Sequence, residues 1–282
     1  MSMPPHQHPR VWFITGISRG FGRELALAAL ADGDSVIGTS RNGQSGLSSN
    51  QLSVFALDVS RAADVSAVVE KAWAIHGGID IVVNNAGFGL LGAVEEVDEA
   101  EARKVFDTNF FGTFHVLHAL LPLLRAQCSG HILNVSSIGG FTGTPGYGLY
   151  NASKFAVEGL SEAVAQELKP FGIHVTIIEP GYFRTGFLSA SSLQRSARVI
   201  EAYASTSGKM RASADARDGR QAGNPALAAR AIISVTRAAK PPLRLVLGAD
   251  ALERVHVKLA QVANDVETWR STTVVTAFQE SA

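Results

Sequence analysis

The sequence lacks several features that would place it in other classes of protein. It contains one cysteine, Cys128, so an internal disulfide and a cysteine-based metal cluster are both excluded. Its eight histidines form no close ligand pattern such as H-x-x-x-H, and we expect no metal site. It also has no apolar stretch of about 18 residues, the length that a membrane-spanning helix needs.

The sequence also has a net charge of zero and no pattern of a secretory signal. The 25 basic side chains are balanced by 25 acidic ones, which argues against a nucleic-acid partner or an anionic membrane partner. Residues 1–10 are polar and have no apolar core of the kind found in signal peptides. We therefore expect a flexible N-terminal tail over residues 1–10 and a cytoplasmic protein.

What the chain does contain is an alternation of short apolar runs and helical patterns. The runs predict strands at Val11–Thr15, Ser35–Thr39, Leu52–Leu57, Ile79–Val83, His131–Val135, His174–Ile178 and Leu243–Leu247. Helical patterns lie between and after them, at Phe21–Asp32, Ala62–Ile75, Glu99–Ala126, Tyr150–Pro170, Pro225–Ala238 and Ala251–Val262.

This rhythm predicts an α/β fold in one domain over residues 11–282. Near-continuous apolar strands separated by helices indicate a doubly wound, mostly parallel, seven-stranded Rossmann sheet with helices on both faces. Pro122 predicts a kink or break near the end of the helix Glu99–Ala126. Residues 186–223 have a weaker pattern, and we expect short helices and loops there that bind substrate.

A glycine-rich loop joins the first strand to the first helix. Such a loop brings backbone N–H groups and the positive end of a helix dipole to a pyrophosphate, although an ordinary turn has a similar sequence. The residues of this loop that we expect at a dinucleotide are Gly16, Ser18, Arg19, Gly20, Phe21 and Gly22.

The residues after the second strand indicate which dinucleotide binds. An NAD site usually has an acidic residue there, whereas this chain has Thr39-Ser40-Arg41. Arg41 can bind a 2′-phosphate, and Arg19 in the glycine-rich loop could close on the same phosphate. The sequence therefore favours NADP(H), unless Arg41 is simply a solvated loop residue.

A candidate acid/base pair follows further along the chain. Tyr150 and Lys154 are four residues apart, so on a helix they share a face, and a nearby ammonium group lowers the pKa of a phenol. Such a pair also occurs by chance on helix surfaces. Ser137, after a strand that ends at the same edge of the sheet, could hold a substrate oxygen, and Asn109 could bind Lys154 through water.

Taken together, these motifs resemble the short-chain dehydrogenase/reductase family. The resemblance runs from residue 11 to about residue 250 and rests on Thr15–Gly22, Asp58-Val59, Asn84–Gly87, Asn109, Ser137, Tyr150 with Lys154, and Pro180-Gly181 with Thr185. A weaker similarity points to the branch that contains 17β-hydroxysteroid and retinol dehydrogenases.

The resemblance implies a role for each matching residue. Tyr150 would be the acid/base, Lys154 would bind the nicotinamide ribose, Ser137 would orient the carbonyl and Asn109 would hold a water. Further cofactor contacts would come from Asp58, Val59, Asn85, Ala86, Gly87, Pro180, Gly181, Phe183 and Thr185.

We therefore expect an NADP(H)-dependent oxidoreductase that acts on a ketone, an aldehyde or a secondary alcohol, and that forms a homodimer or homotetramer. Two alternatives stay open, a non-catalytic NADP(H)-binding redox sensor and an epimerase or dehydratase that regenerates its cofactor. The substrate walls would include Phe88, Leu90, Phe141, Phe187 and Leu188.

Overall fold

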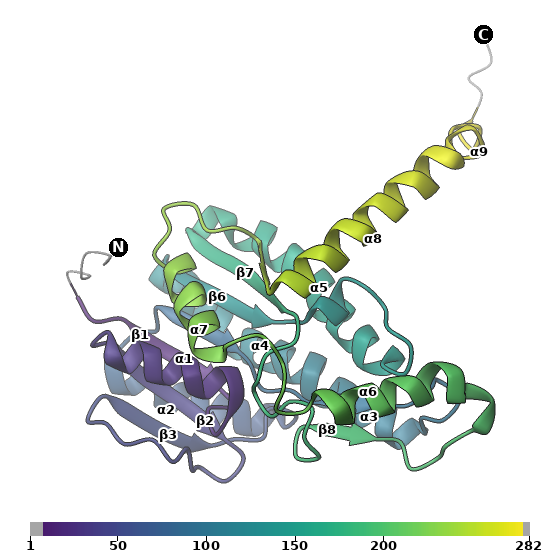
Figure 1. Ribbon diagram of the computed structural model, residues 1–282. Helices are drawn as coiled ribbons and strands as arrows, with labels where there is room; N and C mark the ends of the chain where they lie inside the picture. Colours follow the sequence, from purple (N-terminus) through teal and green to yellow (C-terminus); the bar gives the residue numbers. More distant parts are fainter. Residues whose placement is uncertain (1–7, 279–282) are drawn as a thin grey trace.

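The seven apolar runs form one parallel sheet in a computed structural model that describes residues 8–278. The strands lie in the order β3-β2-β1-β4-β6-β7-β9, and every neighbouring pair is parallel. Helices cover both faces of this sheet (Figure 1). The predicted fold class, a doubly wound Rossmann domain, is confirmed.

The bounds of the elements differ from the sequence-based ones mainly by a few residues. The strands are β1 Val11–Thr15, β2 Ser35–Ser40, β3 Leu52–Ala56, β4 Ile81–Asn84, β5 Gly89–Leu91, β6 Gly130–Val135, β7 Ile173–Pro180, β8 Leu193–Arg195 and β9 Arg244–Leu247. The α-helices are α1 Gly20–Ala31, α2 Ala62–His76, α3 Glu99–Phe106, α4 Gly112–Gln127, α5 Gly148–Leu168, α6 Lys209–Arg217, α7 Pro225–Val235, α8 Ala249–Thr268 and α9 Arg270–Val274.

The two faces of the sheet are covered by different helices because successive strand residues point to opposite sides. In β1, Phe13 packs into the core shared with α2, α4 and α5. Its neighbours Trp12 and Ile14 pack into the core shared with α1 and α7. All three side chains are fully buried, as expected of a strand covered on both faces.

The predicted break at Pro122 is wrong. Helix α4 continues through Pro122 to Gln127, because Leu120 and Leu124 on either side are fully buried and hold the helix against the sheet. The irregularity lies instead at the π-helical turn Asp107–Phe111 between α3 and α4. That turn contains Asn109, and such turns are frequent at functional sites.

Residues 186–223, where we expected substrate to bind, have more structure than their sequence indicates. Strand β8 pairs with β5 in a small second sheet, and α6 follows it. The pairing joins residue 89 to residue 193, so it fastens this region next to the end of β4. No local pattern in three-residue strands could have predicted a pair so far apart in the sequence.

Residues 1–7 of the expected N-terminal tail lie outside the described residues, whereas Arg10, at the end of that tail, is anchored. Its backbone N–H donates to Asp34 Oδ1 at 3.0 Å, and its guanidinium donates to Thr236 Oγ1 at 2.8 Å. Asp34 also accepts a bond from the indole of Trp12 at 2.8 Å. Within residues 8–278, none of the helices combines the length and apolar composition needed to cross a bilayer.

Asp34 is expected to contribute strongly to stability. The variant Asp34→Ala leaves the buried indole N–H of Trp12 and the charge of Arg10 without their partner, which lowers the free energy of unfolding by about 2–4 kcal/mol. Asp64→Ala, which breaks the exposed pair with Arg61, is the control and lowers it by less than about 1 kcal/mol. Urea unfolding measures both, and equal losses would contradict the role of Asp34.

Candidate active site

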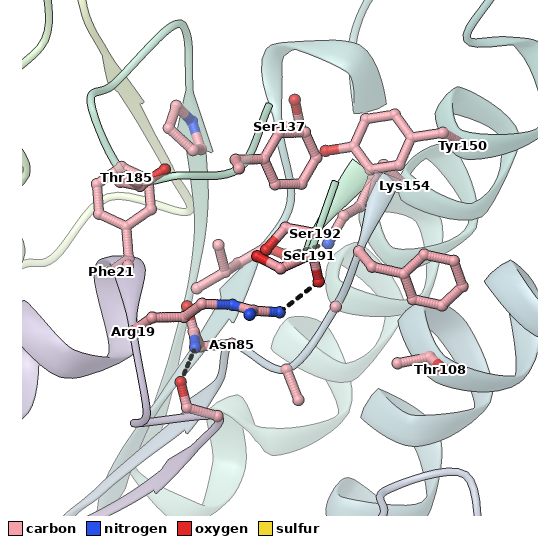
Figure 2. Close-up of a pocket in the computed structure, with 18 of the residues that line it drawn as sticks. Arg19, Phe21, Asn85, Thr108, Ser137, Tyr150, Lys154, Thr185, Ser191 and Ser192 are labelled. Carbon is pink, nitrogen blue, oxygen red and sulfur yellow. Dashed lines mark hydrogen bonds between the residues drawn. The ribbon is translucent and has the colours of Figure 1, made fainter. Parts of the chain in front are cut away.

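A cavity of about 890 Å³ lies beyond the carboxyl ends of the central strands. Residues after β1, β4, β6 and β7 line it, as expected for ligand sites in open parallel sheets. Its volume is within the range of small-molecule and cofactor sites. Figure 2 shows the interior, with the glycine loop on one side and α5 on the other.

The glycine loop is held open towards this cavity by its backbone. Gly16 and Gly20 have positive φ angles of 75° and 60°, and the N–H groups of Gly16 and Ile17 both donate to Thr39 O at 2.9 Å. Helix α1 begins without a side-chain cap and without an acidic residue in its first turn. Its N-terminal N–H groups are therefore available to a ligand, so the loop fits the pyrophosphate of a dinucleotide.

Most residues expected at the cofactor line the cavity. They are Gly16, Ser18, Arg19, Gly20, Phe21, Arg41, Asp58, Val59, Asn85, Ala86, Gly87, Tyr150, Lys154, Pro180, Gly181, Phe183 and Thr185. The amide of Asn85 also fastens the glycine loop, because its Nδ2 donates to Thr15 O at 2.8 Å and to Gly16 O at 3.1 Å. Its contact with a ribose stays a prediction.

Gly22 is the exception among these residues. It does not line the cavity, and a Cβ at this position would lie 2.5 Å from both Gly16 O and Asn85 Nδ2. Gly22 thus allows α1 to pack directly against the loop, which is a structural role. A glycine pattern in the sequence does not distinguish glycines that approach a ligand from those that approach the chain's own backbone.

The two arginines expected at a 2′-phosphate differ in their surroundings. Arg41 lies at the cavity beside Ser40 and Asn42, and its side chain is exposed. Arg19 crosses the cavity and donates through its guanidinium to Ser191 O at 2.6 Å (Figure 2). Arg19 therefore joins the glycine loop to the segment before β8, and a contact of Arg19 with a phosphate would compete with that bond.

Tyr150, Lys154 and Ser137 converge on the same cavity (Figure 2). Tyr150 and Lys154 lie one turn apart on α5 and are only 7% and 6% exposed. Lys154 Nζ donates to Val135 O, the last carbonyl of β6, at 2.7 Å. Ser137 follows β6, and its hydroxyl accepts the Gly139 N–H at 3.0 Å, which fixes its orientation.

The protonation of the pair differs from the sequence-based expectation. Burial raises the pKa of Tyr150 to about 12, and a hydrogen bond with Ser137 opposes this rise. Burial lowers the pKa of Lys154 to about 8, and the carboxylate of Glu158 opposes that fall. The expected lowering of the phenol pKa by Lys154 is not seen here, because burial has the largest effect on this pKa and raises it. Tyr150 is consequently protonated at neutral pH and placed to donate a proton.

Asn109 lies behind this group rather than on the cavity wall. The residue is 1% exposed. Asn109 Oδ1 accepts a hydrogen bond from the Phe88 N–H, and Asn109 Nδ2 donates one to Phe88 O, both at 3.0 Å. Its Nδ2 also donates to Ser153 Oγ at 3.1 Å. Asn109 thus joins the π-helical turn to α5 and to the segment after β4. A water between Asn109 and Lys154 stays a prediction.

The expected substrate walls are present in part. Phe88, Phe187 and Leu188 line the cavity, and the ring of Phe187 lies 5.7 Å from that of Tyr150. Leu90 is buried in the core beneath them, and Phe141 does not line the cavity. Phe187 therefore places an apolar ring beside Tyr150.

Several residues of the cavity wall were not named individually from the sequence, although Ser192 lies within residues 186–223, where we expected substrate to bind. Tyr147 precedes Tyr150 by one helical turn, which is a signal that the helical period could have given. Tyr182 follows the Pro180-Gly181 pair, and Ser192 adjoins β8. Arg254 comes from α8 and donates to Thr144 Oγ1 at 2.6 Å, a contact across 110 residues with no local signal.

Comparisons with known proteins agree with this geometry. The family model described as short chain dehydrogenase matches residues 10–196. The oxidoreductase BOA17 of Botryotinia fuckeliana is 37% identical over 95% of this chain and 99% of its own length. A 3-ketodihydrosphingosine reductase of Bacteroides thetaiotaomicron is 40% identical over 70% of this chain and 72% of its own length. The structure of a short-chain dehydrogenase from Streptomyces avermitilis has a TM-score of 0.89 at 38% identity, covering 96% of this chain and all of that one.

The raised pKa of Tyr150 can be measured on the protein alone. Because burial disfavours the phenolate, we expect no ionisation of Tyr150 below about pH 11. The measurement is the ultraviolet absorbance of tyrosinate as a function of pH, with Tyr150→Phe as the reference. A tyrosine that ionises below pH 10 in the wild type and is missing from the variant would contradict the effect of burial.

Proposed function

Because the chain belongs to the short-chain dehydrogenase/reductase family and is an NAD(P)-dependent oxidoreductase, we propose that it is an NADP(H)-dependent carbonyl reductase for hydrophobic ketones or aldehydes. The observation that carries this proposal is the convergence of Tyr150, Ser137 and Lys154 on one cavity whose opposite side is the glycine loop. A site that only sensed the cofactor would need no buried proton donor at this place.

The proposed chemistry follows from the protonation of these side chains. NADP(H), when bound, supplies the hydride. The hydroxyls of Ser137 and Tyr150 hold the carbonyl oxygen of the substrate, and Tyr150 donates its proton to that oxygen as negative charge develops on it. Lys154, with a pKa of about 8, can release a proton near neutral pH and so helps to return the proton to Tyr150.

The preference for NADP(H) is supported by charge at the end of β2. Arg41 offers a planar guanidinium at the cavity, and the residues beside it there, Thr39, Ser40 and Asn42, are uncharged. A carboxylate at this position would bind a ribose hydroxyl and repel a phosphate. An arginine without a carboxylate therefore favours the phosphorylated cofactor.

The substrate class is supported by the apolar wall and by a relative. Phe88, Phe187 and Leu188 line the cavity and pack in one cluster with Tyr150, which favours an apolar group next to the carbonyl. The 3-ketodihydrosphingosine reductase, 40% identical over 196 residues, is named for the reduction of a ketone. This likeness supports ketone reduction.

The proposed acid/base is tested by Tyr150→Phe, which removes the proton donor and keeps the ring. We expect turnover of a hydrophobic ketone to fall by at least about 100-fold, since acid/base groups contribute roughly 10²–10⁴-fold. Binding of NADPH, followed by its fluorescence, should stay within about threefold of the wild type. Turnover close to the wild-type rate would refute the role of Tyr150.

The proposed cofactor preference is tested by Arg41→Ala, with Arg125→Ala at the exposed end of α4 as the control. Loss of a charged hydrogen-bond set should weaken NADPH by about 1.5–3 kcal/mol and leave NADH nearly unchanged. The Kd values of both cofactors are measured by titration calorimetry. An equal effect of Arg41→Ala on NADPH and NADH would exclude a contact with the 2′-phosphate.

A further inference from the structure

Helix α8 leaves the body of the protein after its first two turns. Its start is anchored, since Asp250 Oδ2 accepts the Tyr182 N–H at 3.0 Å and Arg254 donates to Thr144. Beyond this point every residue from Leu259 to Phe278 is exposed. Figure 1 shows the remainder of α8 projecting from the sheet and its covering helices.

A projecting helix of this kind has little stability of its own. Helices of about 12–15 residues are marginal in water, and most helices in proteins are stabilised by packing of an apolar face. In α8 that face has no partner within the described residues, since only Ala251 is buried. Leu252, Leu259 and Trp269 are 49%, 52% and 63% exposed.

The apolar residues of α8 are not scattered. They recur at alternating intervals of three and four residues, the a and d positions of a coiled-coil heptad. We call this row the α8 seam, and its members are Leu252, Val255, Leu259, Val262, Val266 and Trp269, the last of which is the residue that directly follows α8. Val257, which is 63% exposed, lies outside the seam.

The α8 seam is symmetric about a point between Ala260 and Gln261. In two antiparallel copies of α8 centred there, each a position meets a d position of the other copy. The facing pairs are then Leu252 with Trp269, Val255 with Val266, and Leu259 with Val262. Such a contact is the same surface on both molecules, which is what a twofold dimer requires.

The charges beside the seam fit the same arrangement. Lys258 and Asp265 both flank it at g positions, and g positions face each other in an antiparallel pair. Lys258 of one copy would therefore lie beside Asp265 of the other, twice in each dimer. The antiparallel arrangement places the two protein bodies at opposite ends of the helix pair.

A membrane surface fits the composition of α8 less well than a second copy of the helix does. Helices that lie on membranes carry an excess of Lys and Arg on their polar side. The polar side of α8 instead mixes acidic and basic residues, among them Glu253, Lys258, Asp265 and Glu267. We therefore propose that the α8 seam binds a second copy of this chain in an antiparallel helix pair.

The first test replaces apolar residues of the α8 seam by charged ones while α8 stays helical. Leu259→Glu combined with Val262→Glu places four carboxylates at the centre of each helix pair and should weaken self-association by at least 100-fold. Val257→Glu adds a carboxylate to an exposed position outside the seam and should leave it unchanged. Sedimentation velocity over a range of protein concentrations measures both, with circular dichroism to verify folding. An unchanged assembly in the double variant, or an equal loss in the control, would overturn the proposal.

The second test determines the orientation of the two helices. The substitutions Leu252→Cys and Trp269→Cys are made together in a Cys128→Ser background. The two new cysteines are 17 residues apart, about 25 Å along a helix, so they cannot form a disulfide within one chain. The antiparallel pair predicts disulfides that join residue 252 of one copy to residue 269 of the other. Peptide mapping identifies them. Disulfides between two residues 252, or none at all, would contradict the arrangement.

A third test uses the charges and separates the pairing from membrane binding. Lys258→Asp should weaken self-association about threefold to tenfold, and the further change Asp265→Lys should restore it. Cosedimentation with phosphatidylcholine vesicles containing phosphatidylserine is expected to leave the wild type in solution. Vesicle binding that is lost in Leu259→Glu with Val262→Glu, without any change of assembly, would assign the seam to a membrane instead.

Discussion

The bond from Lys154 Nζ to Val135 O is the contact on which the rest of the site depends. A buried ammonium group must find acceptors, and this carbonyl is the last one of β6. The bond therefore fixes α5 against the carboxyl edge of the sheet. Tyr150 lies one turn before Lys154, and Ser137 lies two residues after Val135. A single contact thus places the phenol, the hydroxyl and the ammonium group on the same cavity.

The same burial that assembles the site sets its chemistry. Taking Tyr150 and Lys154 out of water disfavours both charged forms, so the phenol is kept protonated and the pKa of the lysine falls towards neutrality. In the proposed mechanism Tyr150 therefore acts first as a proton donor, and Lys154, with a pKa of about 8, can exchange a proton near neutral pH.

Sequence patterns predicted those parts that have a local period or motif. The strand runs, Tyr150 with Lys154 and the glycine loop all depend on residues close together in the chain, and the structure places them as expected. Contacts between distant segments were missed, such as β5 with β8 and Arg254 with Thr144. The break expected at Pro122 was wrong because tertiary packing outweighs the loss of one backbone hydrogen bond.

The account is tested most directly by the fate of the hydride. Single turnover of the enzyme with NADPH carrying two deuterium atoms at C4 of the nicotinamide, and with a hydrophobic ketone, should oxidise one NADPH for each alcohol formed. The account predicts deuterium on the carbinol carbon of that alcohol, found by mass spectrometry. An alcohol without deuterium, or bound NADPH that no carbonyl compound oxidises, would contradict it.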